Sequence, residues 1–326
     1  MTNAVLVTGG AGFIGSHLCE ALLQQGFYVY SIDNLDTFYS LNQKKANLNI
    51  LHSYPHFYFI EEDITQPNFG SNLPQMNAVF HLAAKAGVRP SLENPEIYFQ
   101  ANVVGTLAVL EFCRKQKIQN VVFTSSSSVY GLHPKTPWDE NLECGTPISP
   151  YAASKRSAEL LIHTYSHLYN LKTLCLRLFT VYGPRQRPDL AIHKFVQHIF
   201  SQKPISLYGD GSTQRDYTYI KDIVQGILQS YHWLQRQQAP CYEIFNLGSQ
   251  RPITLKEMVG VLEKVMGKSI QTIHLPEQLG DVGVTYANIQ KAHKTFKYSP
   301  QTPFEEGVEA FLKWFKDSLQ INNHYA

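Results

Sequence analysis

A short apolar run passes directly into a glycine-rich turn near the beginning of the chain; the stretch reads Ala4-Val5-Leu6-Val7-Thr8-Gly9-Gly10-Ala11-Gly12-Phe13-Ile14-Gly15. Residues 4–8 predict a buried parallel strand. Apolar residues recur at helical spacing over 14–22, which predicts a helix after the turn. A strand, a glycine turn and a helix in this order form a dinucleotide-binding fingerprint, in which a pyrophosphate rests on the helix N-terminus.

The next predicted strand is followed by an acidic residue. Phe27-Tyr28-Val29-Tyr30-Ser31-Ile32 has the composition of a strand, and Asp33 comes about twenty residues beyond the glycine turn. A carboxylate in that place accepts hydrogen bonds from an adenosine ribose. Because it would also repel the additional phosphate of NADP, we expect the cofactor to be NAD.

Predicted strands and helices continue to alternate along the chain. Further strands are expected over 57–60, 78–82, 120–124 and 172–179, and a long amphipathic helix is expected over about 95–117. The alternation predicts an α/β fold, with a doubly wound parallel Rossmann sheet and a smaller C-terminal α/β lobe that binds the substrate. Ligands of such sheets bind beyond the carboxyl ends of the strands, where we expect Asp33, Asp63, Lys85 and residues 125–128.

A tyrosine and a lysine lie four residues apart in the stretch Ser149-Pro150-Tyr151-Ala152-Ala153-Ser154-Lys155. Pro150 suits the first position of a helix, and the apolar spacing that follows it predicts that helix. Positions i and i+4 share one helix face, so Tyr151 and Lys155 can face one site. A nearby cation favours a phenolate, and we therefore expect Lys155 to lower the pKa of Tyr151 and make it an acid–base group.

Composition and charge exclude several classes of function. The 326 residues carry a formal net charge of +2, which provides no electrostatic footprint for nucleic acid or for a membrane surface. Five scattered cysteines without a Cys-x-x-Cys pair predict reduced thiols in a cytoplasmic protein. No apolar run approaches the length of a membrane span. His163 and His167 lack the glutamate of a zinc motif between them, so no metal site is expected.

Taken together, these segments resemble the extended short-chain dehydrogenase/reductase family, and within it the nucleotide-sugar epimerases. The resemblance covers nearly the whole chain, through residues 8–15, 81–84, 102–106, 125–131, 151 with 155, and 209–217. It implies NAD-dependent inversion at C4 of a UDP-sugar through a transient 4-keto intermediate. It also implies a catalytic set of Ser126, Tyr151 and Lys155, in which Ser126 bonds a sugar oxygen and Tyr151 moves the proton of the 4-hydroxyl group.

The resemblance further implies a cofactor site along the glycine loop and the strand ends. Carried over by position, the cofactor-binding residues are Gly9, Gly12, Phe13, Ile14, Gly15, Asp33, Asn34, Asp63, Ile64, Leu82, Ala83, Ala84, Lys85, Asn102, Tyr151, Lys155 and Phe179. We accordingly assign residues 1–180 and about 217–248 to the NAD-binding domain. Residues from about 181 to 216 and from 249 to 326 are assigned to the UDP-sugar-binding domain.

The serines that follow the catalytic hydroxyl distinguish this chain from related enzymes that catalyse other reactions. Members that resemble sugar 4,6-dehydratases have an Asp-Glu pair there, and members that resemble UDP-glucuronate decarboxylases have a glutamate. Ser127 and Ser128 take these places, so the chemistry is expected to stop at oxidation and re-reduction. Without the neighbouring motifs, residues 125–128 would instead read as a loop that caps backbone groups.

Two segments, 182–189 and 86–95, resemble the UDP-glucuronate 4-epimerase subgroup, whereas galactose-type members have an asparagine at the place of Thr180. An arginine fork suits a carboxylate or a diphosphate, and Arg187 is the first choice, ahead of Arg185 and Arg89. These arginines could instead face solvent or pair with structural acids. The full set expected for the substrate is Arg89, Ser126, Ser127, Ser128, Thr180, Arg185, Arg187, Arg215, Gln278 and Asp281.

Three alternatives stay open at this point. Within the same class, a UDP-glucose or UDP-N-acetylglucosamine 4-epimerase fits the same motifs, and a UDP-glucuronate decarboxylase fits the serines less well. From another class, the chain could be a non-catalytic NAD-binding regulator that kept the fold. The resemblance also implies a homodimer through the helices near 95–117 and 150–169, although apolar positions alone do not distinguish this from burial within one chain.

Overall fold

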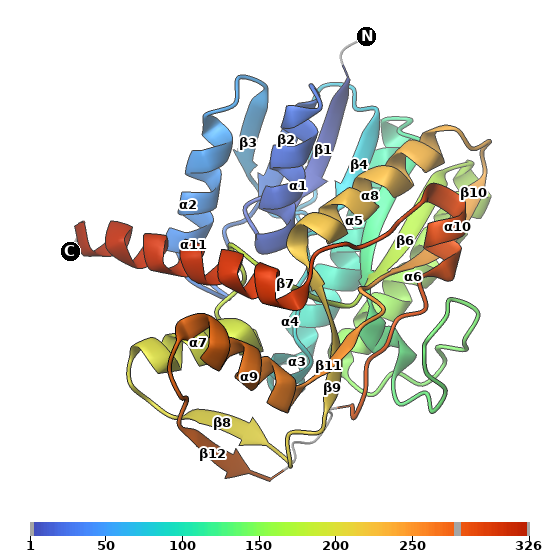
Figure 1. Ribbon diagram of the computed structural model, residues 1–326. Helices are drawn as coiled ribbons and strands as arrows, with labels where there is room; N and C mark the ends of the chain where they lie inside the picture. Colours follow the sequence, from blue (N-terminus) through green and yellow to red (C-terminus); the bar gives the residue numbers. More distant parts are fainter. Residues whose placement is uncertain (1–2, 277–281, 325–326) are drawn as a thin grey trace.

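Seven parallel strands form the central sheet of the computed structural model, which describes residues 3–276 and 282–324 (Figure 1). In spatial order they are β10 (Cys241–Leu247), β6 (Lys172–Leu178), β5 (Asn120–Ser126), β4 (Ala78–His81), β1 (Ala4–Thr8), β2 (Tyr28–Asp33) and β3 (Phe57–Glu61). The chain builds the sheet outward from β1 to β3 and then returns to place β4 on the other side of β1. The predicted doubly wound α/β fold is confirmed, and the strand order reverses between β1 and β4, where such folds bind ligands.

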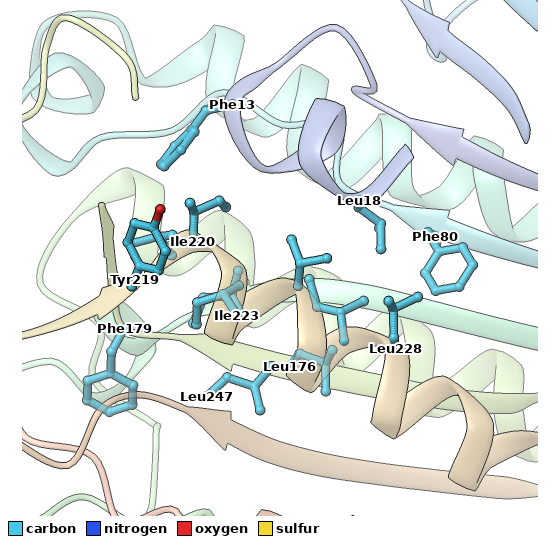
Figure 2. Close-up of a cluster of buried hydrophobic side chains, with 14 of the residues drawn as sticks. Phe13, Leu18, Phe80, Leu176, Phe179, Tyr219, Ile220, Ile223, Leu228 and Leu247 are labelled. Carbon is cyan, nitrogen blue, oxygen red and sulfur yellow. The ribbon is translucent and has the colours of Figure 1, made fainter. Parts of the chain in front are cut away.

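Helices cover both faces of this sheet. One face carries α1 (Phe13–Gln24), α2 (Leu41–His52) and α8 (Ile220–Gln235), and the other carries α5 (Gly105–Lys115) and α6 (Pro150–Tyr169). Figure 2 shows the apolar core on the first face, where Leu18 of α1 and Ile223 of α8 gather with Leu176 of β6. On the other face, Phe123 of β5 packs with Ile162 of α6. Burial on both faces explains why the strands read as continuous apolar runs.

The second half of the chain adds two small sheets, drawn below the central sheet in Figure 1. The first joins β7 (Thr180–Tyr182), β9 (Gln214–Tyr219) and β11 (Pro252–Thr254), and the second pairs β8 (Ile205–Tyr208) with β12 (Thr272–Leu275). The helices of this half, besides α8, are α7 (Ala191–Phe200), α9 (Leu255–Met266), α10 (Gln290–Phe296) and α11 (Phe304–His324). These elements agree with a second α/β lobe, while the domain boundaries assigned above stay a prediction.

The helix expected over 95–117 is interrupted. It consists of α4 (Pro95–Phe99), a π-helical turn η1 (Gln100–Val104) and α5, and the short α3 (Val88–Glu93) precedes it. Asn102 lies in the π-helical turn and its side chain is buried. Such turns frequently occur at functional sites. The sequence did not predict this turn, because one wider turn hardly changes the apolar spacing of the helix around it.

Helix α6 begins at the residue that the sequence predicts. Pro150 is its first residue, and the hydroxyl of Ser149 accepts a hydrogen bond from the amide of Ala152 at 3.1 Å. This cap satisfies one of the amide groups that the first turn of a helix leaves unpaired. At the other end, Asn170 adopts the left-handed conformation and closes the helix. Local sequence therefore defines both ends of the helix that carries Tyr151 and Lys155.

Two glycines make the turn after β1 possible. Gly9 has a φ of +76°, and a Cβ on it would lie 2.7 Å from the amide nitrogen of Ala83. A Cβ on Gly15 would overlap the carbonyl oxygen of Gly9. The loop is therefore packed against both α1 and the segment after β4, and neither position has room for a side chain.

We expect Gly15→Ala to lower the free energy of unfolding by roughly 1–3 kcal/mol, because the added methyl group must displace the loop. Gly260 offers a matched control, since it lies exposed within α9 with open space around its Cα. Gly260→Ala should raise the free energy of unfolding by about 0.5–1 kcal/mol. Urea unfolding followed by circular dichroism measures both variants. A Gly15→Ala protein as stable as the original chain would contradict the packing described for this loop.

Candidate active site

A large cleft opens at the carboxyl ends of the central strands. Its volume is about 620 Å³, which is within the usual range for small-molecule sites. It brings together the glycine loop, the ends of β4 and β5, the start of α6 and residues from the second half of the chain. The sequence-predicted residues that line it are Gly9, Gly12, Phe13, Ile14, Gly15, Asp33, Asn34, Asp63, Ile64, Leu82, Ala83, Ala84, Lys85, Ser126, Ser127, Ser128, Tyr151, Lys155, Phe179, Thr180, Arg187 and Arg215.

Asp33 is held rigidly beside the glycine loop. Its carboxylate accepts hydrogen bonds from the amide of Ala11 at 3.2 Å, from the amide of Leu35 at 2.9 Å and from the ammonium of Lys44 at 3.1 Å. Both side chains of the Asp33–Lys44 ion pair are buried. The acid thus lies where a dinucleotide fingerprint requires it. Sequence reasoning missed Lys44, because α2 has a weak apolar pattern and was not predicted as a helix.

Asn102 joins three segments behind the cleft wall. Its side-chain carbonyl accepts a hydrogen bond from the amide of Lys85 at 2.8 Å. Its side-chain amide donates to the carbonyl of Lys85 at 2.9 Å and to the hydroxyl of Ser154 at 2.9 Å. Asn102 was expected at the cofactor, but it lies one layer deeper and fixes the segment after β4 to α6. The ammonium of Lys85, in turn, donates to the carboxylate of Asp36 at 2.7 Å.

A chain of buried hydrogen bonds runs beneath the same wall. His81 Nδ1 lies 2.8 Å from the hydroxyl of Thr8, and His81 Nε2 lies 2.9 Å from the hydroxyl of Thr106. Because the Thr106 hydroxyl donates to the carbonyl of Asn102 at 2.6 Å, His81 donates through Nε2 and accepts through Nδ1. Burial and the charge of Lys155 lower the pKa of His81 to about 3, so the ring stays neutral. The only signal in the sequence for this series of hydrogen bonds was a polar residue within an apolar strand.

Ser126, Tyr151 and Lys155 meet in the cleft from two elements. Ser126 is the last residue of β5, and its hydroxyl accepts a hydrogen bond at 3.2 Å from the amide of Ser128, in the 3₁₀ turn η2 (Ser127–Tyr130). The Ser126 hydroxyl is near enough to the Tyr151 phenol to favour its ionised form. Lys155 lies one helical turn beyond Tyr151, is buried, and its ammonium is 4.5 Å from the ring centre of Phe123.

The structure does not show the expected lowering of the pKa of Tyr151. Burial raises the pKa of the Tyr151 phenol, and the nearby hydroxyl of Ser126 and the charge of Arg187 only oppose that rise. Burial likewise lowers the pKa of the Lys155 ammonium to about 7, against the opposing charge of Glu159. The sequence argument considered the lysine charge but not the cost of removing both groups from water, which is larger here. Near neutral pH, the protonation of Lys155 therefore responds to small changes in the surrounding charge.

Two of the candidate arginines line the cleft, Arg187 and Arg215. Arg187 donates two parallel hydrogen bonds of 2.8 Å to the carboxylate of Asp189, and its guanidinium lies over the ring of Phe38. This fork geometry is the one that a carboxylate or phosphate of a ligand also requires. The charge of Arg187 acts on the Tyr151 phenol, so the two side chains belong to one electrostatic environment.

Arg185 and Arg89, which were also expected to bind the substrate, are not among the residues that line the cleft. Arg185 is buried and pairs with Glu20 of α1 at 2.6 Å, which is the structural alternative considered for it. Arg185 has a left-handed backbone conformation, with a φ of 63°. Arg185 and Arg187 therefore have different surroundings, although only one residue separates them. Arg89 lies over the ring of Tyr208, 5.1 Å from its centre. Gln278 and Asp281 are outside the described residues.

Comparison with known proteins assigns this arrangement to a family. The family model described as "NAD dependent epimerase/dehydratase family" matches residues 5–248. The chain belongs to this family. A UDP-glucuronate 4-epimerase of Thermodesulfobacterium geofontis is 42% identical to it over 97% of each chain.

Solved structures of similar family members share the whole fold. A UDP-glucuronic acid 4-epimerase from Bacillus cereus, in complex with UDP-glucuronic acid and NAD, has a TM-score of 0.91 at 36% identity. A UDP-glucose 4-epimerase from Thermotoga maritima, with UDP-glucose, has a TM-score of 0.87 at 31% identity. Each comparison covers 97% of this chain and 99% of the other. The resemblance inferred from the motifs is therefore confirmed.

The family also confirms NAD as the cofactor, and the residues present fit it. The glycine loop is compact, because a Cβ on Gly9 or Gly15 would collide with neighbouring backbone atoms. The Asp33 carboxylate lies directly beside that loop. Within residues 3–276 and 282–324, no cluster of histidine, cysteine, aspartate or glutamate side chains could hold a metal ion. In the same described ranges, no helix has the length and apolar character needed to cross a membrane.

Proposed function

We propose that this family member is a UDP-sugar 4-epimerase that interconverts UDP-glucuronate and UDP-galacturonate. The observation that carries the proposal is the meeting of Ser126, Tyr151 and Lys155 with the glycine loop in one cleft. A phenol and a hydroxyl that line the same cleft are suited to moving the proton of a sugar alcohol. The similarity to UDP-glucuronate 4-epimerases over nearly the full chain supports the choice of a sugar nucleotide with a carboxylate.

In the proposed reaction Tyr151 and Ser126 act on the sugar, and the positive charge of Lys155 favours the phenolate form of Tyr151. In its phenolate form, Tyr151 removes the proton of the 4-hydroxyl group as C4 is oxidised, and Ser126 donates a hydrogen bond to the oxygen that becomes a carbonyl. When bound, NAD supplies the hydride acceptor for C4 and the hydride donor for its re-reduction. The flat 4-keto sugar turns over in the cleft, and Tyr151 returns the proton after reduction of the opposite face. The product is inverted at C4.

Neutral donors are proposed to hold the sugar carboxylate. Ser127, Ser128 and Thr180 line the cleft, and the buried hydroxyl of Ser128 has no hydrogen-bond partner in the described part of the chain. A buried hydroxyl in that state is suited to bonding a ligand atom. We propose that Arg187 binds an anionic group of the substrate. That group would compete with the carboxylate of Asp189 for the guanidinium of Arg187.

The proposal is tested by incubating the purified chain separately with UDP-glucuronate, UDP-glucose and UDP-N-acetylglucosamine and resolving the C4 epimers. We expect UDP-galacturonate to form at least about ten-fold faster than the other products, because a site built for a carboxylate leaves its donors unpaired with a neutral sugar. Tyr151→Phe should lose turnover by about 10²–10⁴-fold while retaining NAD, since it removes only the proton carrier.

Each alternative has its own outcome in this assay. Faster epimerisation of UDP-glucose or UDP-N-acetylglucosamine would change the substrate but keep the reaction. Release of carbon dioxide with a UDP-pentose would indicate a decarboxylase. A protein that binds NAD but converts none of the three sugars would indicate a regulator, and the proposed function would then be wrong.

Thr180 is expected to contribute to the choice of sugar. An asparagine there would bring a carbonyl oxygen close to the proposed carboxylate position, and that oxygen repels an anion but accepts a bond from a hydroxymethyl group. Thr180→Asn should therefore lower the kcat/KM ratio of UDP-glucuronate to UDP-glucose by roughly ten-fold, the effect of about one hydrogen bond. Thr180→Ser keeps the hydroxyl and is the matched control. Equal ratios in the asparagine and serine variants would remove Thr180 from the proposed site.

We also propose that the chain forms a homodimer through α4, α5 and α6. These helices lie side by side, as the hydrogen bond of 2.7 Å from the Tyr165 hydroxyl to the Glu111 carboxylate shows. Together with the turn η1, which joins α4 to α5, they expose large apolar side chains, namely Ile97, Phe99, Val104, Leu107, Leu160 and Leu168. Apolar patches of this kind mark protein interfaces, and a second copy with the same face would cover them.

Sedimentation equilibrium tests the homodimer. The original chain should have twice its mass of 37.1 kDa, and Leu160→Lys should be monomeric, because it would bury an unpaired charge in the interface. Ile273→Lys is the control, since Ile273 is also exposed but lies on β12. A monomeric original chain, or a dimer that tolerates Leu160→Lys, would contradict this interface.

Two further expectations stay proposals. All five cysteines are free thiols and four of them are buried, which supports a reducing compartment such as the cytoplasm. The two small sheets and their helices support a substrate lobe distinct from the Rossmann sheet, with Thr180 and Arg215 contributed to the cleft from β7 and β9.

A further inference from the structure

A buried carboxylate behind the cleft has no part in the reaction as proposed so far. Glu159 lies one helical turn beyond Lys155 on α6 and is fully buried. Its oxygens accept hydrogen bonds from the hydroxyl of Ser125 at 2.6 Å and from two nitrogens of Arg177, Nε at 3.0 Å and Nη2 at 2.9 Å. A fourth bond of 2.9 Å comes from Arg156. Glu159 is therefore the centre of a buried cluster of charged and polar groups.

This cluster connects α6 to three strands of the central sheet. Ser125 precedes Ser126 on β5, and Arg177 lies on β6 with its guanidinium 4.8 Å from the ring centre of Tyr130. The hydroxyl of Tyr130 donates to the side chain of Asn246 on β10 at 2.7 Å. One carboxylate thus fixes the strand end that carries the catalytic serine relative to the helix that carries the tyrosine and the lysine.

We infer that Glu159 is a positioning residue for the active site, which locks α6 to the end of β5 and provides the negative charge that Lys155 faces. The inference deepens the proposed function and rests on Tyr151 being its proton carrier, with the ammonium of Lys155 one helical turn away on the same helix. Stability alone is a weak reason for such a cluster, because burying charged groups costs solvation that well-packed apolar side chains do not require.

Glu159 is the carboxylate whose negative charge acts on Lys155, although it is itself paired with Arg156 and Arg177. Tyr151 and Glu159 lie one helical turn before and after Lys155 on α6, the ring centre of Phe123 on β5 is 4.5 Å from its ammonium, and His81 on β4 and Cys175 on β6 interact with it electrostatically. Burial lowers the pKa of Lys155 to about 7, and Glu159 is the first of the charges that oppose this. Removing the carboxylate should therefore lower the pKa of Lys155 further, so that the ammonium loses its proton at a lower pH.

The test is a direct titration of Lys155 in the full-length protein. Lysine labelled with ¹³C and ¹⁵N reports the protonation of each ammonium by NMR, and the loss of one signal in Lys155→Met assigns it. We expect Glu159→Gln to lower the midpoint of this titration by about one pH unit relative to the original chain. The amide oxygen of glutamine can still accept the bonds from Ser125 and from Arg177 Nε, whereas the two bonds to the second carboxylate oxygen, from Arg177 Nη2 and Arg156, are lost.

A second variant keeps the test informative if an unpaired Arg177 prevents folding. Glu159→Gln combined with Arg177→Met removes one charge of each sign, and it should show a lowered midpoint, by less than Glu159→Gln alone because loss of the Arg177 charge offsets part of the effect, with folding preserved. Glu111→Gln is the matched control, because Glu111 also accepts bonds from an arginine and a hydroxyl on a neighbouring helix but is not among the charges that act on Lys155. Its midpoint should equal that of the original chain.

Enzyme kinetics give a second readout. In both Glu159 variants, the loss of kcat at rising pH should begin at a lower pH, as Lys155 is deprotonated earlier. An unchanged NMR midpoint in both Glu159 variants, or a fall in kcat that is equal at every pH, would overturn the inference and leave Glu159 a structural residue. If the original chain converts no UDP-sugar, the proposed function fails, whereas the NMR titration still decides whether Glu159 controls the charge of Lys155.

Discussion

Parallel pairing of β1 with both β2 and β4 is the constraint on which the site depends. Because the chain leaves β1 in one direction and returns on its other side, the glycine loop, the end of β4 and the end of β5 open onto one edge. The loop can approach β4 only because Gly9 lacks a side chain, and the contact with Ala83 closes the floor of the cleft. A change in strand order would separate these groups even if every motif were kept.

Desolvation gives the site its chemical character. Tyr151 and Lys155 lie on the face of α6 that packs toward the sheet, and removal from water disfavours the charged form of each. Two of the groups that oppose this effect come from other elements, Ser126 from β5 and Arg187 from the loop after β7, and the third, Glu159, comes from the next turn of α6. The acid–base properties therefore belong to the packed assembly and not to the Tyr-x-x-x-Lys motif alone.

The loop after β7 shows how strongly local backbone geometry separates similar residues. Arg185 and Arg187 are both arginines in one motif, yet one pairs with Glu20 on α1 and the other pairs with Asp189 at the cleft. The first attaches this loop to the cofactor half of the chain, and the second presents a fork to a ligand. Sequence spacing could not distinguish them, because the left-handed conformation of Arg185 is not encoded by a glycine.

The sequence by itself determined the alternation of strands and helices, the glycine turn with Asp33, the start of α6 at Pro150 and the grouping of Ser126, Tyr151 and Lys155. Each of these depends on residues near one another in the chain, or on strand ends that a parallel sheet brings together. Only the tertiary structure decided that Lys44 pairs with Asp33, that Asn102 lies behind the cleft wall, and that burial raises the pKa of Tyr151. These outcomes depend on contacts between distant segments and on exclusion of water, neither of which the spacing of residues records.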